Sequence, residues 1–202
     1  MAHKVICINR RCGSGGHIIG EMVAQELGIK YYDKNLLDLA LEYGGLDNSK
    51  EYHKADEKAT SSAFYRLQYD GNDKVDKGKP INDTLFQLQR DFMREITQKE
   101  DCVLVGRCAD YILDPKKVSL LSVFITAPFD FRVERIMEQD NLSKRQASLH
   151  IKKIDKRRED YYQYFTKQDW KSTKTYDLVI NSQSLGFKKS TKLLCDCYNN
   201  LL

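Results

Sequence analysis

Short apolar runs alternate with amphipathic stretches along most of the chain. The runs are short and rich in aliphatic and aromatic residues, which predicts β-strands at residues 4–9, 29–32, 102–105, 120–126 and 177–181. Between them, apolar positions recur at helical spacing, which predicts helices at residues 17–27, 35–43, 85–96, 129–139, 144–164 and 188–199. Strands that alternate with helices favour an α/β fold in which helices cover both faces of a parallel sheet.

The stretch from residue 45 to residue 80 departs from this alternation. It is charged, poor in Val and Ile, and ends in the glycine- and charge-rich run 70–80. A length of 202 residues fits one domain. We therefore interpret 45–80 as a partly helical excursion and mobile loop that caps the substrate side of a single domain, 1–202. Asp83 is then expected to cap the helix that follows.

Composition narrows the class of protein. Hydrophobic residues make up 41% of the chain, and 33 Lys and Arg against 29 Asp and Glu leave a formal net charge of +4. Disordered chains carry fewer apolar residues and proteins dedicated to duplex DNA carry a larger positive charge, so both classes are disfavoured. A positive surplus that converges on one cleft suits an anionic ligand.

The cysteines and the N-terminal residues indicate the cellular compartment. No apolar run reaches the roughly 18 residues of a membrane span, and the opening residues show no signal-peptide pattern. We therefore expect a cytoplasmic protein, no membrane partner and six reduced cysteines. Cys195 and Cys197 form a C-x-C pair, but zinc needs two further ligands that the sequence does not offer nearby. We expect no metal held by a recognisable protein motif.

A glycine-rich segment joins the first predicted strand to the first predicted helix. It consists of Gly13, Ser14, Gly15, Gly16 and His17. Successive main-chain N–H groups in such a turn, together with the positive end of the helix, form a phosphate cradle that needs no side chain. The alternative is a tight turn in which glycine only supplies a positive φ. Its place at the first strand–helix junction favours phosphate binding.

This segment departs from the Walker A pattern G-x-x-x-x-G-K-[ST]. The pattern's leading glycine falls on Arg10, its lysine on Gly16 and its hydroxyl residue on His17. The lysine that clamps phosphate and the hydroxyl that holds magnesium are therefore both missing. The sequence predicts a variant phosphate loop without lysine.

Motifs along the chain resemble those of the cytidylate kinase-like family, relatives of the nucleoside monophosphate kinases. The opening is similar to I-x-x-R-x-x-G-S-G-G-x-x-I, with one residue of slip between Ile8 and Arg10. Further similar segments are G-I-x-x-Y-D-K at 28–34, V-I-V-G-R-x-A-D-Y-I-L at 103–113, T-A-P-x-x-x-R-x-x-R at 126–135, and several short matches within 154–181. Only residues 45–80 lack such a match.

The resemblance implies a P-loop kinase fold with three layers. It would contain a five-stranded parallel sheet flanked by helices, an acceptor-side insert at 45–80 and a lid-like helical region at about 143–170. It also implies transfer of the γ-phosphoryl group of ATP, or another nucleoside triphosphate, to a small acceptor such as CMP, with Mg²⁺ bridging the phosphates. Arg10 is then placed to supply the charge that Gly16 withholds, since a guanidinium fork suits phosphate. The alternative is a solvated arginine at a strand end.

Two further positions serve the acceptor by the same resemblance. Asp33 ends the second predicted strand, where related kinases direct a carboxylate toward the acceptor or the magnesium shell. The alternative for Asp33 is a cap on the following helix. Arg107 directly follows the third strand and resembles the arginine that grips the acceptor phosphate. The alternative for Arg107 is a surface salt bridge.

Four arginines are candidates on the donor side. Arg132 and Arg135 lie three residues apart on one helix face, so both can point at the same anion, and in relatives this region handles the donor base and phosphates. Arg157 and Arg158 belong to a basic run that would form the lid and stabilise the transferred group on closure. The alternative is a solvated helix face. We interpret the aromatic residues that follow as packing: Tyr161, Tyr162, Tyr164, Phe165 and Trp170.

These observations lead to two hypotheses from different classes. The first is a nucleoside monophosphate kinase of the cytidylate type. The second is a nucleotide-binding sensor that no longer catalyses, because the lysine and the hydroxyl are missing. Nucleic acid is disfavoured as a partner, and the sequence does not determine the oligomeric state. Nor does it identify the acceptor, because residues 45–80 match no motif.

Overall fold

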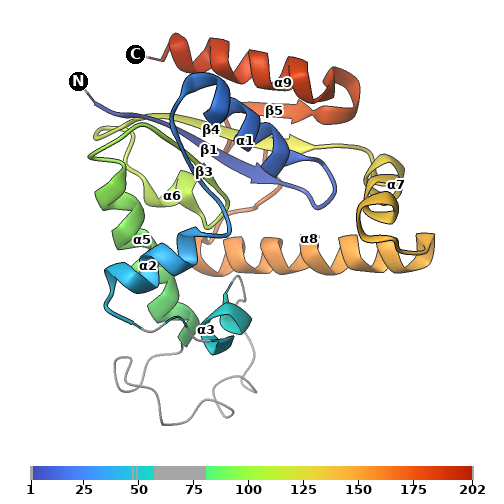
Figure 1. Ribbon diagram of the computed structural model, residues 1–202, viewed down its shortest axis with the longest axis horizontal. Helices are drawn as coiled ribbons and strands as arrows, with labels where there is room; N and C mark the ends of the chain where they lie inside the picture. Colours follow the sequence, from blue (N-terminus) through green and yellow to red (C-terminus); the bar gives the residue numbers. More distant parts are fainter. Residues whose placement is uncertain (1, 47, 49, 57–80, 202) are drawn as a thin grey trace.

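The computed structural model describes residues 2–46, 48, 50–56 and 81–201 (Figure 1). At its centre is a five-stranded sheet with the order β2-β3-β1-β4-β5, and every pair of neighbours is parallel. The strands are β1 (Lys4–Arg10), β2 (Lys30–Tyr32), β3 (Cys102–Val105), β4 (Ser119–Thr126) and β5 (Leu178–Asn181). The predicted parallel sheet is confirmed, and each strand lies within one residue of its predicted limits.

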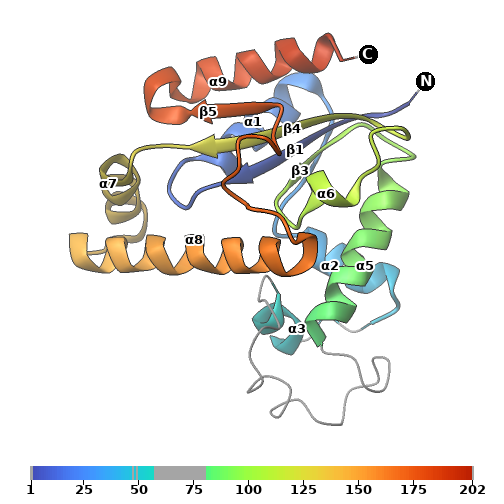
Figure 2. The same ribbon diagram turned by 180° about the vertical axis from the view of Figure 1, so that it is seen from behind.

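Helices cover both faces of the sheet, so the protein has the three layers that the sequence predicts (Figures 1 and 2). One face packs against α1 (Gly16–Leu27) and α9 (Ser182–Asn199). The other packs against α5 (Ile81–Ile96), the short α6 (Ala109–Ile112) and the C-terminal part of α8 (Lys144–Thr166).

β1 has apolar residues at consecutive positions, and the packing of these residues on both faces of the sheet explains why. Ile6 and Ile8 pack toward α1 and α9, whereas Val5 and Cys7 pack toward the opposite layer. All four are at most 1% exposed. A central parallel strand is buried on both faces, and its residues are therefore apolar at consecutive positions.

Among the described residues, three further helices pack beside these layers. α2 (Leu36–Tyr43) and α3 (Lys50–Ala55) share a hydrophobic cluster with α5. α7 (Phe129–Asp140) packs against the N-terminal part of α8. Of the predicted insert 45–80, α3 is described, whereas residues 57–80 lie outside the described part of the chain.

The structure differs from the predictions made from the sequence in three places. α9 begins at Ser182, six residues before its predicted start, with non-helical backbone at Gly186. α6 was not predicted, because four residues are too few to show helical periodicity. Asp83 lies within the first turn of α5 rather than capping it.

The predicted lid region is dominated by one continuous helix. α8 runs for 23 residues and begins with a capping box in which Ser143 and Gln146 bond each other's main chain. Its two parts pack against α7 and against the sheet, so in this structure α8 is docked on the body of the protein. Within the described residues, none of the helices has the length and apolar character needed to cross a membrane.

Candidate active site

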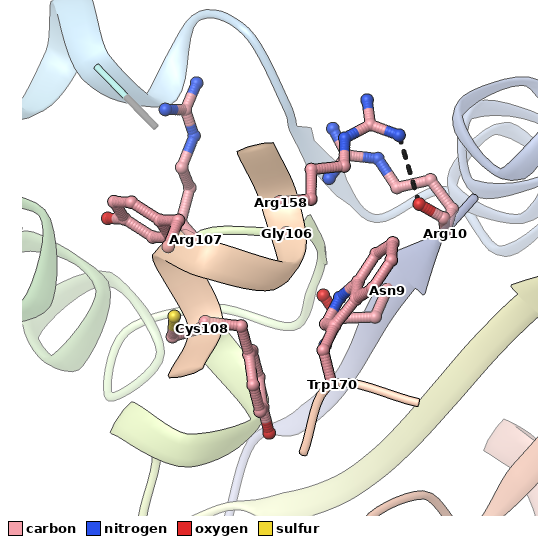
Figure 3. Close-up of a pocket in the computed structure, with 9 residues that line it drawn as sticks. Asn9, Arg10, Gly106, Arg107, Cys108, Arg158 and Trp170 are labelled. Atoms are coloured by element: carbon pink, nitrogen blue, oxygen red, sulfur yellow. Dashed lines mark hydrogen bonds between the residues drawn. The ribbon is translucent and has the colours of Figure 1, made fainter. Parts of the chain in front are cut away.

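The chemistry-bearing residues gather where β1, β2 and β3 end. A small cleft at this edge is lined by main chain and side chains of β1, the turn after β3, α8 and the segment that follows α8 (Figure 3). Its lining residues are Asn9, Arg10, Gly106, Arg107, Cys108, Arg158, Tyr161, Tyr162 and Trp170. The carboxyl ends of parallel strands are the usual place for ligands in such sheets.

The glycine-rich segment forms an open turn ahead of α1. Gly13 and Gly15 both have φ of 78°, which is the left-handed region where a side chain is strained. Gly15 caps α1 without any side-chain hydrogen bond. Among the described residues, no acceptor bonds the main-chain N–H groups of Gly13, Gly15, Gly16 or His17. These donors are available to an anion at the positive end of α1.

The carbonyl groups of the same turn are all held by donors. Arg158 Nη1 donates to Arg10 O at 3.0 Å. The carbonyls that follow accept from these donors: Ser14 Oγ to Arg11 O, Arg132 Nη1 to Cys12 O, Arg135 Nε to Gly13 O, Ser182 Oγ to Ser14 O and the Ile19 N–H to Gly15 O. In a planar trans peptide the N–H points opposite to the C=O. Each held carbonyl therefore fixes the direction of the N–H on its far side.

Arg10 occupies the space that a Walker lysine would need. A Cβ atom built on Gly16 would lie 2.5 Å from Arg10 Cβ and 3.0 Å from Arg10 Cγ. The guanidinium reaches across β3, where a Cβ on Gly106 would overlap its Nη1 atom. Arg10 Nη2 then donates to Asp33 Oδ1 at 3.2 Å. Arg10 therefore spans the edge of the sheet from the glycine-rich turn to the end of β2.

Asp33 directly follows β2 and is 8% exposed. Besides Arg10, the Tyr31 hydroxyl donates to its Oδ2 atom at 3.4 Å and to His17 O at 3.1 Å. The N-cap of α2 is Asn35, so the alternative interpretation of Asp33 as a helix cap is wrong. Tyr31 was not singled out in the sequence, because a tyrosine at a strand end is usually a packing residue.

The turn after β3 holds Arg107 in an uncommon conformation. Gly106, Arg107 and Cys108 have φ of 80°, 57° and 57°, three successive left-handed residues. Such backbone is strained for residues with side chains and occurs often at functional sites. Arg107 is 7% exposed and forms an ion pair with Asp56, just after α3. The ion pair of Arg107 is therefore buried, unlike the surface salt bridge that was the alternative interpretation of this residue.

Arg132 and Arg135 do not converge on one open space. Arg132 is 5% exposed and bonds the Asp155 carboxylate at 2.8 Å as well as two carbonyls, Cys12 O and Ala127 O. Arg135 bonds Gly13 O and lies over the ring of Phe187, 4.5 Å from its centroid. Both arginines hold the glycine-rich turn from outside. Their predicted contact with the donor stays a prediction.

The two lid arginines differ in position. Arg158 lines the cleft and bonds Arg10 O, as the dashed line in Figure 3 marks. Arg157 is half-buried on α8 and does not line the cleft. The aromatic residues pack as expected. Trp170 is 2% exposed against Phe124, and Phe165 stacks on Phe86 at 4.0 Å.

Burial shifts the pKa values of several titratable groups at this edge, among them His17 and Asp110. Burial lowers the pKa of His17, an effect that nearby Arg10 reinforces and Asp33 opposes. Burial raises the pKa of Asp110, although the Tyr162 hydroxyl and the Asn9 amide both donate to its carboxylate. Asp110 orients Asn9 and Tyr162, which both line the cleft. The sequence analysis did not single it out as a site residue.

Residues that could hold a metal are few. Within 2–46, 48, 50–56 and 81–201, no three His, Cys, Asp or Glu side chains are grouped as in a metal site. Asp33 is linked to the glycine-rich turn through its partner Arg10. Mg²⁺ commonly takes one or two carboxylates and completes its shell with substrate phosphates and water. The described residues therefore form no preformed metal site, and a Mg²⁺ ion here would depend mainly on the phosphates of a nucleotide and on water.

Comparisons with known proteins agree with this geometry. The cytidylate kinase-like family matches residues 5–184. A cytidylate kinase of Methanobrevibacter smithii is 23% identical over 190 residues, which cover 94% of this chain and 95% of that one. A cytidylate kinase of Sulfolobus acidocaldarius is 23% identical over 182 residues, or 89% of this chain and 86% of that one.

Solved structures show the same fold. A crystal structure of an uncharacterized protein from Eubacterium ventriosum has a TM-score of 0.73 and 24% identity, and covers 98% of this chain and 99% of that one. The shikimate kinase of Bacteroides thetaiotaomicron has a TM-score of 0.53 and 15% identity, with 97% and 98% coverage. The fold is therefore that of the P-loop kinases, as the sequence implied.

Proposed function

Because the chain belongs to the cytidylate kinase-like family, we propose that it transfers the γ-phosphoryl group of ATP, or another nucleoside triphosphate, to a nucleoside monophosphate such as CMP. The family and the fold make it a kinase-like protein of the nucleotide-binding class. The donor, the acceptor and the catalytic residues are the parts that belong to the proposal.

The proposal rests on which main-chain groups of the glycine-rich turn are hydrogen-bonded. Its carbonyls accept bonds from surrounding donors, whereas the N–H groups of Gly13, Gly15, Gly16 and His17 have no acceptor among the described residues. An arrangement of this kind stabilises an anion without reorganising when the anion binds. It supports binding of the donor phosphates at the start of α1.

Arg10 supports transfer rather than binding alone. Its guanidinium lies between the glycine-rich turn and Asp33, on the line between the proposed donor and acceptor sides. Phosphoryl transfer spreads negative charge over the moving group, so a buried cation there stabilises the transition state more than the ground state. We assign to Arg10 the role that the lysine has in a Walker loop.

Asp33 and Arg107 act on the acceptor side of this proposal. Asp33 would orient the attacking oxygen or hold a water of the Mg²⁺ shell, and Arg107 would bind the acceptor phosphate. A bound Mg²⁺ would neutralise part of the charge that develops on the phosphates. Arg107 is buried and already paired with Asp56, so a phosphate would compete with that carboxylate for the same guanidinium.

α8 supplies the wall that excludes water from the reaction. Arg158 and the aromatic residues Tyr161 and Tyr162 lie over the same cleft as Arg10. Excluding water strengthens each charge interaction in the cleft and limits wasteful hydrolysis of the triphosphate. Closure of Arg157 onto the donor remains part of the proposal.

A nucleotide-binding sensor is the second candidate function, and one observation favours it. Arg10 is paired with Asp33, so the cation and the carboxylate neutralise each other. A protein that only binds nucleotide could keep this pair unbroken. A kinase must let Arg10 turn from Asp33 to the transferred phosphoryl group.

The test is a coupled measurement of ADP formation with Mg²⁺, ATP and a panel of CMP, dCMP, UMP, AMP and GMP. We expect ADP formation that depends on one of these acceptors and exceeds hydrolysis without acceptor. If ATP binds and no monophosphate stimulates ADP formation, the sensor replaces the kinase. If ATP does not bind, both candidate functions fail.

A further inference from the structure

The shape of the glycine-rich turn depends on a carboxylate that belongs to α8. Asp155 is 8% exposed, and its Oδ1 atom accepts a 2.7 Å hydrogen bond from the main-chain N–H of Cys12. Its Oδ2 atom accepts from Arg132 Nη1 at 2.8 Å and from Arg11 Nη1 at 3.4 Å. One side chain in the middle of α8 thus contacts the turn and two of the arginines around it.

Arg132 extends this contact to the next peptide. The Nη1 atom that bonds Asp155 also donates to Cys12 O at 2.9 Å, and its Nε atom is fixed by Ala127 O at 3.1 Å. The N–H opposite the Cys12 carbonyl belongs to Gly13, one of the donors without an acceptor among the described residues. Asp155 therefore fixes the peptide before Cys12 directly and the peptide after it through Arg132.

We propose that Asp155 is a positioning residue for the donor: through Cys12 and Arg132 it aims the Gly13 N–H at the phosphates. The proposal rests on the function proposed above. Asp155 does not contact the nucleotide in this account, because both its oxygens are used by the protein. It also assigns to Arg132 a role in shaping the turn instead of the predicted contact with the donor.

This role changes the interpretation of α8. The middle of α8 bonds the glycine-rich turn through Asp155 and Arg158, so this helix supports the turn in addition to its predicted role as a lid. If α8 moves away, the peptides on both sides of Cys12 lose their partners. Opening of α8 and loss of the phosphate cradle are therefore one event.

The experiment compares two variants with two controls. Asp155→Ala removes every bond, and Asp155→Asn keeps an oxygen for the Cys12 N–H but removes the charge that Arg132 faces. Asp160→Asn removes a carboxylate of the same helix whose only ion pair in the described structure is the exposed one with Lys156. Tyr198→Phe removes a buried bond to Asp101 at the opposite end of the sheet, and so matches a loss of stability away from the turn.

Binding of MgATP without acceptor, measured by calorimetry, is the first readout. We expect Asp155→Ala to weaken it by about 10- to 100-fold, because small misplacements of positioned groups have effects of that size. Asp155→Asn should fall in between, and both controls should stay within about twofold of the wild type. The same loss should appear in the KM for ATP and not in the KM for the acceptor. Folded Asp155→Ala with wild-type affinity overturns the proposal, and so does an equal loss in Tyr198→Phe.

Amide exchange in the wild-type chain provides a readout that needs neither nucleotide nor a soluble alanine variant. The Cys12 amide should be protected without ligand, and Asp155→Asn should reduce its protection in part, because the neutral amide oxygen that it keeps accepts more weakly than a carboxylate. Rapid exchange of this amide in the wild type overturns the proposal. Protection together with wild-type protein that does not bind MgATP leaves the positioning of the turn intact and refutes the proposed function instead.

Discussion

Replacing Arg10 with alanine should lower kcat much more than it lowers affinity for the nucleoside triphosphate. Arg10 is 8% exposed and reaches from the glycine-rich turn to Asp33. In this structure its charge is matched by that carboxylate. A bound triphosphate therefore exchanges one anionic partner for another, which contributes little net affinity. The transition state differs, because charge develops there beside the guanidinium.

The size of the effect follows from the electrostatics of a partly buried site. Two unit charges about 4 Å apart interact by about 4 kcal/mol at an effective dielectric constant of about 20. Each 1.36 kcal/mol is a factor of ten in rate, so about 4 kcal/mol corresponds to a loss of about 10³-fold in kcat. We expect the dissociation constant for the triphosphate to rise by less than about tenfold.

Arg10→Ala also leaves the Asp33 carboxylate buried without its cation, which should destabilise the fold by about 3–5 kcal/mol. The double variant Arg10→Ala, Asp33→Asn tests this loss of stability, because it also removes the unpaired carboxylate. Its kcat is not compared, since Asp33 is itself proposed to act on the acceptor. Chemical denaturation of both variants and steady-state kinetics of Arg10→Ala provide the assay. A folded Arg10→Ala protein with kcat within tenfold of the wild type refutes the reasoning. So does an affinity that falls as much as kcat.

Three further predictions concern the turn, the acceptor and protonation. Gly15→Val should abolish triphosphate binding, whereas Gly28→Val, which has a similar positive φ but open space around it, should leave binding intact; calorimetry of both variants checks this, and unaltered binding in Gly15→Val contradicts it. Arg107→Ala should lower kcat/KM for the acceptor by about 2–4 kcal/mol in transition-state terms, and a loss of donor affinity alone would place this arginine on the donor side. Because the pKa of His17 is lowered in the free protein and phosphate beside it favours the protonated ring, triphosphate binding should take up protons and tighten as pH falls from about 8 to 6. Calorimetry in buffers of different ionisation enthalpy measures that uptake, His17→Gln should remove it, and its absence in the wild type counts against phosphate at this position.

Much of the fold could be predicted because the central strands β1, β3 and β4 are buried on both faces. Consecutive apolar residues, as in β1, distinguish such strands from amphipathic helices without any knowledge of tertiary structure. The short α6 gave no comparable signal, because four residues span about one helical turn. The kink at Gly186 was missed for another reason. A glycine near a helix start is compatible with a cap, a break or an ordinary first turn.

The candidate site was predicted in part. The glycine-rich turn, Arg10, Asp33, Arg107 and Arg158 gather at one edge, because the carboxyl ends of parallel strands meet there. The partners of buried side chains could not be predicted from the sequence.

Asp155 and Arg132 are 23 residues apart in sequence, and Asp155 and Cys12 are 143 apart. Pairing across such separations is a consequence of packing between α7, α8 and the turn. Helical spacing alone therefore indicated a shared anionic ligand for Arg132 and Arg135, whereas in the folded chain both bond carbonyls of the turn.

The central claim is that a turn without lysine still supports phosphoryl transfer, and a single-turnover experiment tests it most directly. Wild-type protein in excess over γ-³²P-labelled ATP, with Mg²⁺ and CMP, is quenched over time and the labelled products are separated. The account predicts that label moves from ATP into CDP, and that Arg10→Ala slows this step about 10³-fold while ATP remains bound. Bound ATP whose label stays in place, or appears only as inorganic phosphate, with CMP and with every other nucleoside monophosphate, would contradict it.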